Sequence, residues 1–415
     1  MKYWVVFILL IIGQGLFSAC SSDSEFLGAP ADVDHAEVYV SVTLSVGGSQ
    51  GMTRATVTPP QGGNPSVSLQ DGTFQESYID PDDVELFVFD QANKFVDRVN
   101  IIWRTHSGNT DNVDSPEAQP YQCHIQGYLK DVSEGNYHIV AICNQKRGVL
   151  KSNDYSPTRA STTLDDFIDG VTYGSYSADF TATLLGGSSS SPSDARIPMW
   201  GICTVPLKQG ENATAPITVL RSMAKVVVRL ADNVTDFQLT GVILNVANDG
   251  GTLAAQKTGE TVQAYKESSG SYTTAWNKLD ETPITTPSIP SGVNSVSEGL
   301  LFSEVTEDDG VKCYVIYIPE YNHFKDDNDG ETVQETATIE LTIEDEAGNS
   351  VTDSNGNNYK LHFADYSDGE SPTAPEWDII RNDIYDYTIT KIESGLQVKL
   401  KVAPWAEYTH SGVVM

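Results

Sequence analysis

The chain has 415 residues and a formal net charge of −32, from 57 acidic and 25 basic residues. Nucleic acid and anionic lipid headgroups are bound through positive patches that release counterions, and the sequence has no basic cluster to form one, so we expect no nucleic-acid partner. This length predicts two or three domains, each large enough for its own core.

The N-terminus has the pattern of a secretory signal peptide. Lys2 precedes an apolar run over residues 3–12, which is too short to span a bilayer, and small residues follow before Cys20. A cysteine directly after two small residues is typical of a lipoprotein, in which the sulfur carries a diacylglycerol. We therefore expect residues 1–19 to be a lipoprotein signal peptide and Cys20 to be lipidated. The alternative is an ordinary secretory signal with Cys20 as a bystander.

The rest of the chain is rich in short strand patterns. Residues 37–46 alternate without a fault between apolar and polar types, which indicates a half-buried strand. The apolar set is Val38, Val40, Val42, Leu44 and Val46, and the polar set begins at Tyr39. Further strands are predicted over 84–90, 137–144, 224–230, 241–246, 314–318, 338–344, 386–392 and 396–402. One short helix is expected at 163–169, with Thr162 or Thr163 as its cap.

Many short strands separated by Gly, Asn, Asp and Ser turns predict an all-β protein built from sandwiches of antiparallel sheets. A change in composition at residues 211–216 precedes the strand at 224–230, and we place a domain boundary near Arg221. The expected division is an N-terminal sandwich over 55–220, a C-terminal sandwich over 221–403 and a tail over 404–415.

Four cysteines remain besides Cys20, namely Cys123, Cys143, Cys203 and Cys313. They are widely scattered, and no two form a C-x-x-C pair. A disulfide framework is typical of much smaller secreted domains, so buried thiols are expected, with a single bridge as the alternative.

The sequence lacks the groups of residues that catalysis or metal binding requires. None of its seven histidines has the spacing of a two-histidine metal site, and it has no nucleophile elbow, phosphate loop or dinucleotide fingerprint. Two acidic loops, 326–330 and 353–358, resemble calcium loops, but the first would place Lys325 and Thr336 at ligand positions. Turns are the simpler interpretation of both, so we expect no enzyme activity, no cofactor and no metal.

Several segments, taken together, resemble a known family. They are the leader ending at Cys20 and residues 85–90, 135–144, 197–201, 221–228 and 381–389, the last of which leads to 402–405. In order and spacing, over most of the mature chain, they resemble the FimA-like fimbrillins, the pilin family of Bacteroidetes-type pili. The resemblance implies two tandem transthyretin-like β-sandwich domains.

The resemblance also implies a processing pathway. Members of the family are exported as outer-membrane lipoproteins, cut by a trypsin-like protease after an Arg behind the first strand, and polymerised by strand exchange. Arg54 is the only Lys or Arg between Cys20 and Lys94, so the implied cut leaves Ala55 as the new N-terminus and makes residues 20–54 a propeptide. The alternative is that Arg54 is an ordinary loop residue.

The strand at 37–46 gives this processing a physical meaning. If it completes the first sandwich, its departure opens an apolar groove with unpaired backbone groups on both sides, which pairs readily with a strand of another chain. The tail over 404–415 has β-forming side chains and little charge, and it resembles the donor arm of stalk pilins, with Tyr408, Val413 and Val414 in the candidate donor strand. Packing of the tail on its own domain is the alternative.

We therefore expect a structural pilin subunit of a cell-surface fimbria that supports adhesion or biofilm formation. Its expected partners are other pilin subunits in a homopolymer, a trypsin-like processing protease and, before processing, the outer membrane. The alternative is a tip or anchor adhesin, or a glycan-binding surface lipoprotein, that does not polymerise as a stalk. A secreted hydrolase is the least supported class.

Overall fold

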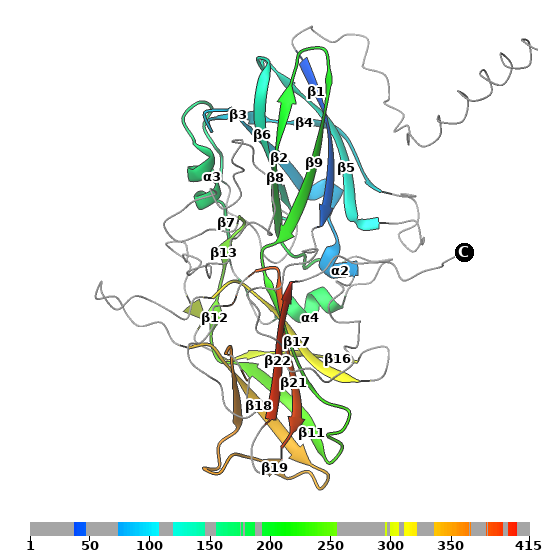
Figure 1. Cartoon of the computed structure of the whole chain (residues 1–415), viewed down its shortest axis with the longest axis vertical. Helices are drawn as coiled ribbons and strands as arrows, with labels where there is room; N and C mark the ends of the chain where they lie inside the picture. The colour runs from blue at the N-terminus through cyan, green and yellow to red at the C-terminus, as the bar shows by residue number, and fades with distance from the viewer. Residues whose placement is uncertain are drawn as a thin grey trace, which may run out of the picture.

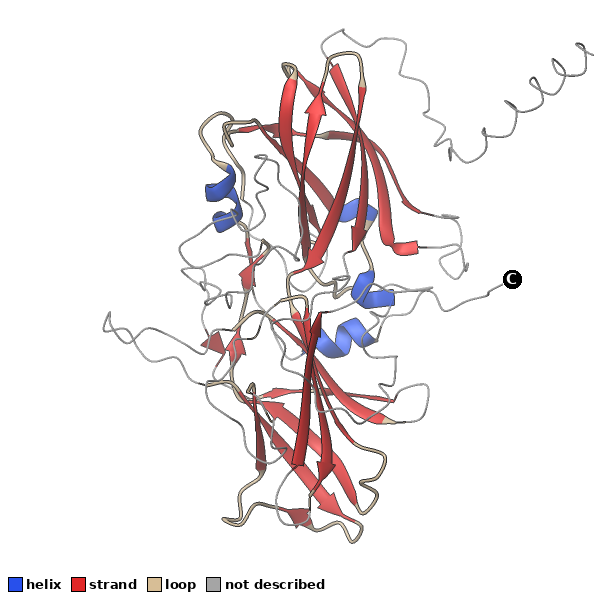
Figure 2. Ribbon diagram, in the orientation of Figure 1, coloured by secondary structure: helices blue, strands red, loops and turns tan. Residues whose placement is uncertain are grey.

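The computed structural model describes most residues between 37 and 404, and the structural statements below concern these residues. They are 37–46, 74–107, 119–145, 155–174, 176, 179–186, 193–254, 295–296, 299–306, 311–321, 336–364, 366, 379, 381–392 and 397–404. The regular elements are mostly strands, which confirms the all-β prediction (Figure 2). Each strand predicted above is present, with ends that differ by a few residues at most.

The upper half of the molecule in Figure 1 is a sandwich whose strands form one eight-stranded sheet in the order β3-β2-β6-β8-β9-β1-β5-β4. β8 and β9 pair only at the corner where Met199–Gly201 faces Val219–Arg221, so the described sheet splits beyond it into two layers. β3 and β4 lie at opposite ends of this order but are separated in sequence by Val99 alone, which closes the sandwich on its other side. The strands are β1 (Glu37–Val46), β2 (Val84–Phe89), β3 (Phe95–Arg98), β4 (Asn100–Ser107), β5 (Gln119–Lys130), β6 (Gly135–Cys143), β8 (Met199–Leu207) and β9 (Asn212–Arg221).

The lower half is a sandwich of two five-stranded sheets (Figure 1). The first has the order β16-β17-β10-β21-β22, with β16 (Ser303–Thr306), β17 (Lys312–Ile318), β10 (Ala224–Leu230), β21 (Asp383–Lys391) and β22 (Gln397–Pro404). The second consists of β15 (Leu300–Leu301), β11 (Phe237–Leu244), β18 (Thr338–Asp345), β19 (Ser350–Val351) and β20 (Tyr359–His362). The Tyr387 hydroxyl of β21 donates to the His362 carbonyl of β20 over 3.0 Å, and the Phe363 ring packs on Tyr385 and Tyr387, so aromatic side chains join the two sheets.

Short elements lie beside the upper sandwich and between the two halves (Figure 1). The helices are α2 (Phe74–Ser77), α3 (Leu164–Gly170) and α4 (Asp179–Leu185), and a 3₁₀ turn, η2, spans Pro81–Asp83. The expected helix is α3, and Thr163 and Asp166 close its first turn as a capping box. Two ribbons complete the described elements: β7 (Thr172–Tyr173) with β13 (Gly251–Thr252), and β12 (Ala247–Asn248) with β14 (Ser295–Val296).

The sheets are antiparallel, as predicted, except at two pairs. β1 runs parallel to β9, and β10 runs parallel to β21. A parallel pair needs a long connection between its strands, and both pairs join segments far apart in sequence, so no local pattern signals them. β9 ends at Arg221, close to the predicted boundary, while the division of the chain into domains with the bounds given above stays a prediction.

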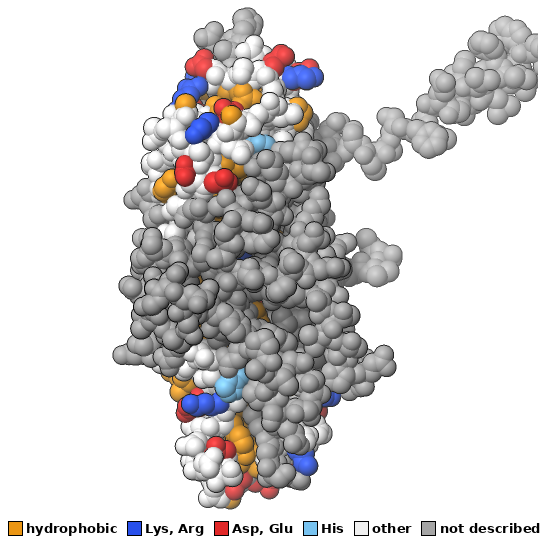
Figure 3. Space-filling view, turned by 60° about the vertical axis from the view of Figure 1, so that its left-hand side comes forward, with side chains coloured by type: hydrophobic (Ala, Val, Ile, Leu, Met, Phe, Trp, Pro, Cys, Tyr) orange, Lys and Arg blue, Asp and Glu red, His pale blue; other side chains and the backbone are white. Residues whose placement is uncertain are grey.

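Acidic side chains are spread over the surface. On the face in Figure 3 they lie at both ends of the molecule, interspersed with Lys and Arg. For the described residues on this face, the mixture of both charge signs is typical of a solvated surface.

Buried charged groups join the two sandwiches. Glu76 of α2 is fully buried, and its Oε1 lies 2.7 Å from Nζ of Lys225 on β10. The Tyr317 hydroxyl of β17 donates to the same carboxylate. Arg221, at the end of β9, donates from Nε to the Glu76 carbonyl over 2.8 Å and from a terminal nitrogen to the Ser77 hydroxyl over 2.9 Å. Because charges buried from water keep their partners, this network fixes α2 against both sandwiches.

We expect Glu76→Ala to lower the free energy of unfolding by about 3–5 kcal/mol, because it leaves the buried Lys225 ammonium without its carboxylate. Urea denaturation followed by tryptophan fluorescence measures the change. Lys312→Ala is the control, because Lys312 pairs with Glu304 on the surface, where ion pairs contribute little. Equal destabilisation by the two substitutions would contradict the role of the network.

Candidate functional site

The strand predicted at residues 37–46 is β1, and it lies inside the upper sandwich. Figure 1 shows it in dark blue between β9 and β5. It pairs antiparallel with β5 from Glu37 to Ser45 and parallel with β9 from Tyr39 to Val46. Both of its edges are therefore hydrogen-bonded to neighbours. We call the space between β5 and β9 that β1 occupies the β1 slot.

The inward face of β1 is part of the core. Its five side chains are at most 1% exposed: Val38, Val40, Val42, Leu44 and Val46. Burial of such a side chain stabilises a fold by roughly 1.5–3 kcal/mol before ordering costs are subtracted. The alternation in the sequence therefore predicted both the strand and the face that it buries.

Side chains on the outward face of β1 contact side chains of β5. Glu37 Oε1 lies 3.3 Å from Lys130 Nζ, and the Tyr39 and Tyr128 rings lie 6.3 Å apart between centroids. The Thr43 hydroxyl and His124 Nδ1 are hydrogen-bonded over 3.1 Å. Burial lowers the pKa of His124, which favours the neutral imidazole in this contact. The sequence gives no sign of these contacts, because nothing in it reveals which strand lies beside β1.

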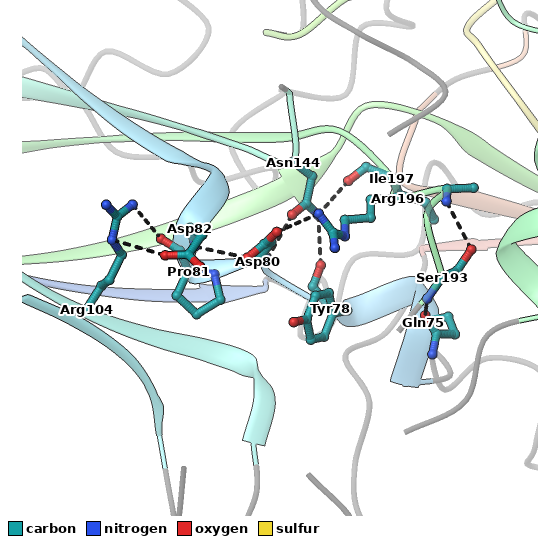
Figure 4. Close-up of polar contacts among 11 residues, drawn as sticks. Gln75, Tyr78, Asp80, Pro81, Asp82, Arg104, Asn144, Ser193, Arg196 and Ile197 are labelled. Carbon is teal, nitrogen blue, oxygen red and sulfur yellow. Dashed lines mark hydrogen bonds and ion pairs between the residues drawn. The ribbon is translucent and has the colours of Figure 1, made fainter. Parts of the chain in front are cut away.

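The chain that follows the loop after β1 is held by a separate polar cluster, drawn in Figure 4. Arg196 lies 2.5 Å from Asp80, and the Asp80 N–H donates to the Asn144 side-chain oxygen over 2.9 Å. The Asn144 amide donates in turn to the carbonyls of Tyr78 and Ile197 over 2.8 and 2.9 Å. Residues 75–83 are thereby fixed to β6 and to the segment before β8. The residues that make these contacts lie outside β1.

The residues singled out for processing and donation lie outside the described part of the chain. These are Cys20, Arg54, Ala55, Tyr408, Val413 and Val414. The structure describes the elements beside them: β1 lies between Cys20 and Arg54 in sequence, and β22 pairs with β21 at the edge of its sheet and ends at Pro404, just before the tail.

Cys123, Cys143, Cys203 and Cys313 are buried, as expected, and none of them forms a disulfide in the described structure. Cys123 stands opposite Leu44 in the pairing of β5 with β1, so it lies on the core side of the slot. Burial raises the pKa of the Cys123 thiol to about 12.

The described residues bring no three His, Cys, Asp or Glu side chains together in a group that could hold a metal ion. The acidic loop at 326–330 lies outside them. The loop at 353–358 is a turn, in which Asp353 Oδ1 accepts from the N–H groups of Asn355 and Asn357 over 2.8 and 2.9 Å. Within the described part, none of the helices is long and apolar enough to cross a membrane.

The chain matches the family model of the fimbrillin-A associated anchor proteins Mfa1 and Mfa2 over residues 59–411. Among solved structures it is similar to the tip fimbrial protein Mfa3 from Porphyromonas gingivalis with a C-terminal truncation, at 13% identity and a TM-score of 0.47, over 89% of this chain and 100% of that chain. A candidate cell adhesion protein from Parabacteroides distasonis has 14% identity and a TM-score of 0.46, over 90% and 98%. A fimbrial assembly protein from the same organism has 11% identity and a TM-score of 0.41, over 89% and 98%. None of the curated proteins gives a match.

We expect the Cys123 thiol to report on whether β1 is in place. In the intact chain its alkylation by iodoacetamide at pH 8 should be slow, because the thiol is buried and its pKa is about 12. Val42→Asp puts a charge into the core, displaces β1 and should raise the rate at least ~10-fold. Peptide mass spectrometry measures the modified fraction of each cysteine.

Two controls accompany this experiment. Ser41→Asp carries the same charge on the outward face of β1 and should leave Cys123 unreactive. Cys313 lies on β17 of the lower sandwich and should stay unreactive in all three proteins. Equal reactivity of Cys123 in the Val42→Asp and Ser41→Asp variants would show that β1 does not protect it.

Proposed function

The chain belongs to the family of fimbrillin-A associated anchor proteins Mfa1 and Mfa2, and we propose that it is a subunit of a cell-surface fimbria that other subunits join through the β1 slot. The membership bears out the resemblance to fimbrillins found in the sequence. It also favours a structural role.

The observation that supports this proposal is the place of β1. A strand inside a sheet, with five buried aliphatic side chains, is bonded to the rest of the sandwich on both edges but joined to it covalently only through residues 47–73. A single cut in that connection leaves β1 held only by its hydrogen bonds and its side-chain packing, and the described elements outside β1 stay covalently continuous. The slot can then take a strand from another chain with the same backbone hydrogen bonds.

The proposed pathway has three steps. Cys20 is lipidated and carries the precursor to the outer membrane. A trypsin-like protease cuts between Arg54 and Ala55, and residues 20–54 leave with β1. The tail, with Tyr408, Val413 and Val414 in its donor strand, enters the slot of a neighbouring subunit, and the resulting fimbria supports adhesion.

An anchor subunit is the second candidate, favoured by the description of the family as anchor proteins. Such a subunit would keep Cys20 and β1, remain in the outer membrane and hold the fimbria through its tail.

Intact-mass measurement of the protein extracted from the cell surface separates the two candidates. A released fimbrial subunit begins at Ala55 and carries no lipid, whereas an anchor retains Cys20 and the diacylglycerol. For the released subunit we expect Arg54→Ala to leave residues 20–54 attached. Lys94→Ala is the matched control and should not affect the cut. Loss of residues 20–54 from the Arg54→Ala protein would contradict cleavage at this position.

We expect deletion of residues 405–415 to leave the fold intact and to stop the chain from entering fimbriae, because the deletion removes the tail and spares β22. Circular dichroism and urea denaturation check the fold, and immunodetection in purified fimbriae checks incorporation. Normal amounts of the truncated chain in fimbriae would rule out the donor role of the tail.

A further inference from the structure

The inward positions of the β1 slot set strict limits on its occupant. All five side chains that β1 places there are aliphatic and at most 1% exposed, so a replacing strand needs an aliphatic side chain at every second position. Space is limited beside Val40. This residue stands opposite Gly127 of β5, and a Cβ on Gly127 would lie 2.5 Å from Cγ1 of Val99. Val99 thus already fills the space next to Val40.

The outward positions of the slot also restrict which side chains an occupying strand can carry. Lys130 presents an ammonium group at one end, where β1 supplies Glu37. His124, near the other end, meets the hydroxyl of Thr43, and Tyr128 meets the ring of Tyr39. The occupant that fits has an acidic residue beside Lys130, polar residues on the outward face and five residues of the size of Val or Leu on the inward face.

The tail of this chain does not have that pattern in either alternation. If the odd-numbered residues of 405–415 faced inward, Glu407, Thr409 and Ser411 would enter the core. If the even-numbered residues faced inward, His410 and Gly412 would do so. Burial of a charged or polar side chain without a partner is unfavourable, and Gly leaves the core unfilled. Reversing the strand direction changes neither set.

We propose, as a refinement of the function proposed above, that the β1 slot accepts a strand from a different kind of subunit and not the tail of a second copy. That strand carries five residues of the size of Val or Leu at alternate positions and an acidic residue opposite Lys130. The chain is therefore a joint between unlike subunits in a mixed fimbria. This assignment excludes the homopolymer expected from the sequence.

A strand-displacement experiment tests this assignment. The protein is residues 21–415, with residues 51–57 replaced by the recognition sequence of a sequence-specific protease, so that one cut separates β1 from the rest while β1 stays in its slot. Isotope-labelled peptides are added at a series of concentrations, and native mass spectrometry follows the release of the β1 fragment. The peptides are residues 35–48, residues 405–415, and residues 405–415 with Glu407→Val, Thr409→Val and Ser411→Val.

Peptide 35–48 should displace the β1 fragment. The tail peptide should need a concentration at least ~30-fold higher for the same release, because three or more aliphatic contacts are lost. The tail peptide with the three Val substitutions should release the fragment at a concentration at least ~10-fold lower than the unsubstituted tail peptide. The assignment is wrong if the tail peptide releases the β1 fragment at a concentration less than ~30-fold above that of peptide 35–48. It is also wrong if the three substitutions do not improve release by the tail peptide. Either result leaves strand exchange itself intact. Failure of peptide 35–48 to displace the fragment overturns strand exchange as well, and the proposed function with it.

Discussion

The pairing of β9 with β1 is the interaction on which the upper sandwich depends. β8 holds only the last three residues of β9, so over Asn212–Thr218 the described sheet partner of β9 is β1. On its other edge β1 pairs with β5 along almost its whole length. β1 therefore attaches β9 to the β5–β4 pair and covers the core between them. An empty slot would leave two open strand edges over an apolar floor, which is the condition under which sheets recruit strands from other chains.

The segment that follows the connection after β1 is held by contacts with residues outside β1. The short segment at 75–83 makes two buried sets of contacts, one through Glu76 to Lys225 and Tyr317 and one through Asp80 to Arg196 and Asn144. Residues 47–73 thus connect two firmly held points, the end of β1 and the start of α2. A cut between them separates β1 from the rest but breaks neither set of buried contacts. Strand exchange at this place is compatible with a rigid subunit for that reason.

Local sequence patterns predicted the parts of the fold that have strict alternation, and they failed where the pattern is interrupted. The bounds of β1 follow from ten residues of unbroken alternation, and α3 follows from its cap. β5 was not predicted, because Gly127 interrupts its apolar face at the point where Val99 takes the space of a side chain. β9 was not predicted either, because its Pro216 argues against a strand inside a sheet. The neighbours of β1, and so the contacts on its outward face, arise from pairing between distant segments that no local pattern encodes.

The proposed cleavage and the mismatch of the tail both affect which strand occupies the β1 slot. While β1 is tethered through residues 47–73 it is present at its slot at an effective concentration on the order of millimolar, which no separate strand at lower concentration overcomes unless it binds far more tightly. A cut removes this advantage and leaves β1 as one competitor among others. If the tail fitted the β1 slot, it would then enter either the slot of the same chain or the slot of another copy, without any control over which. Because the inward positions of the slot reject Glu407 in one alternation and His410 in the other, neither product forms. The slot stays covered until a strand with the matching pattern arrives, so the difference in affinity between the right and wrong strands determines the order of assembly.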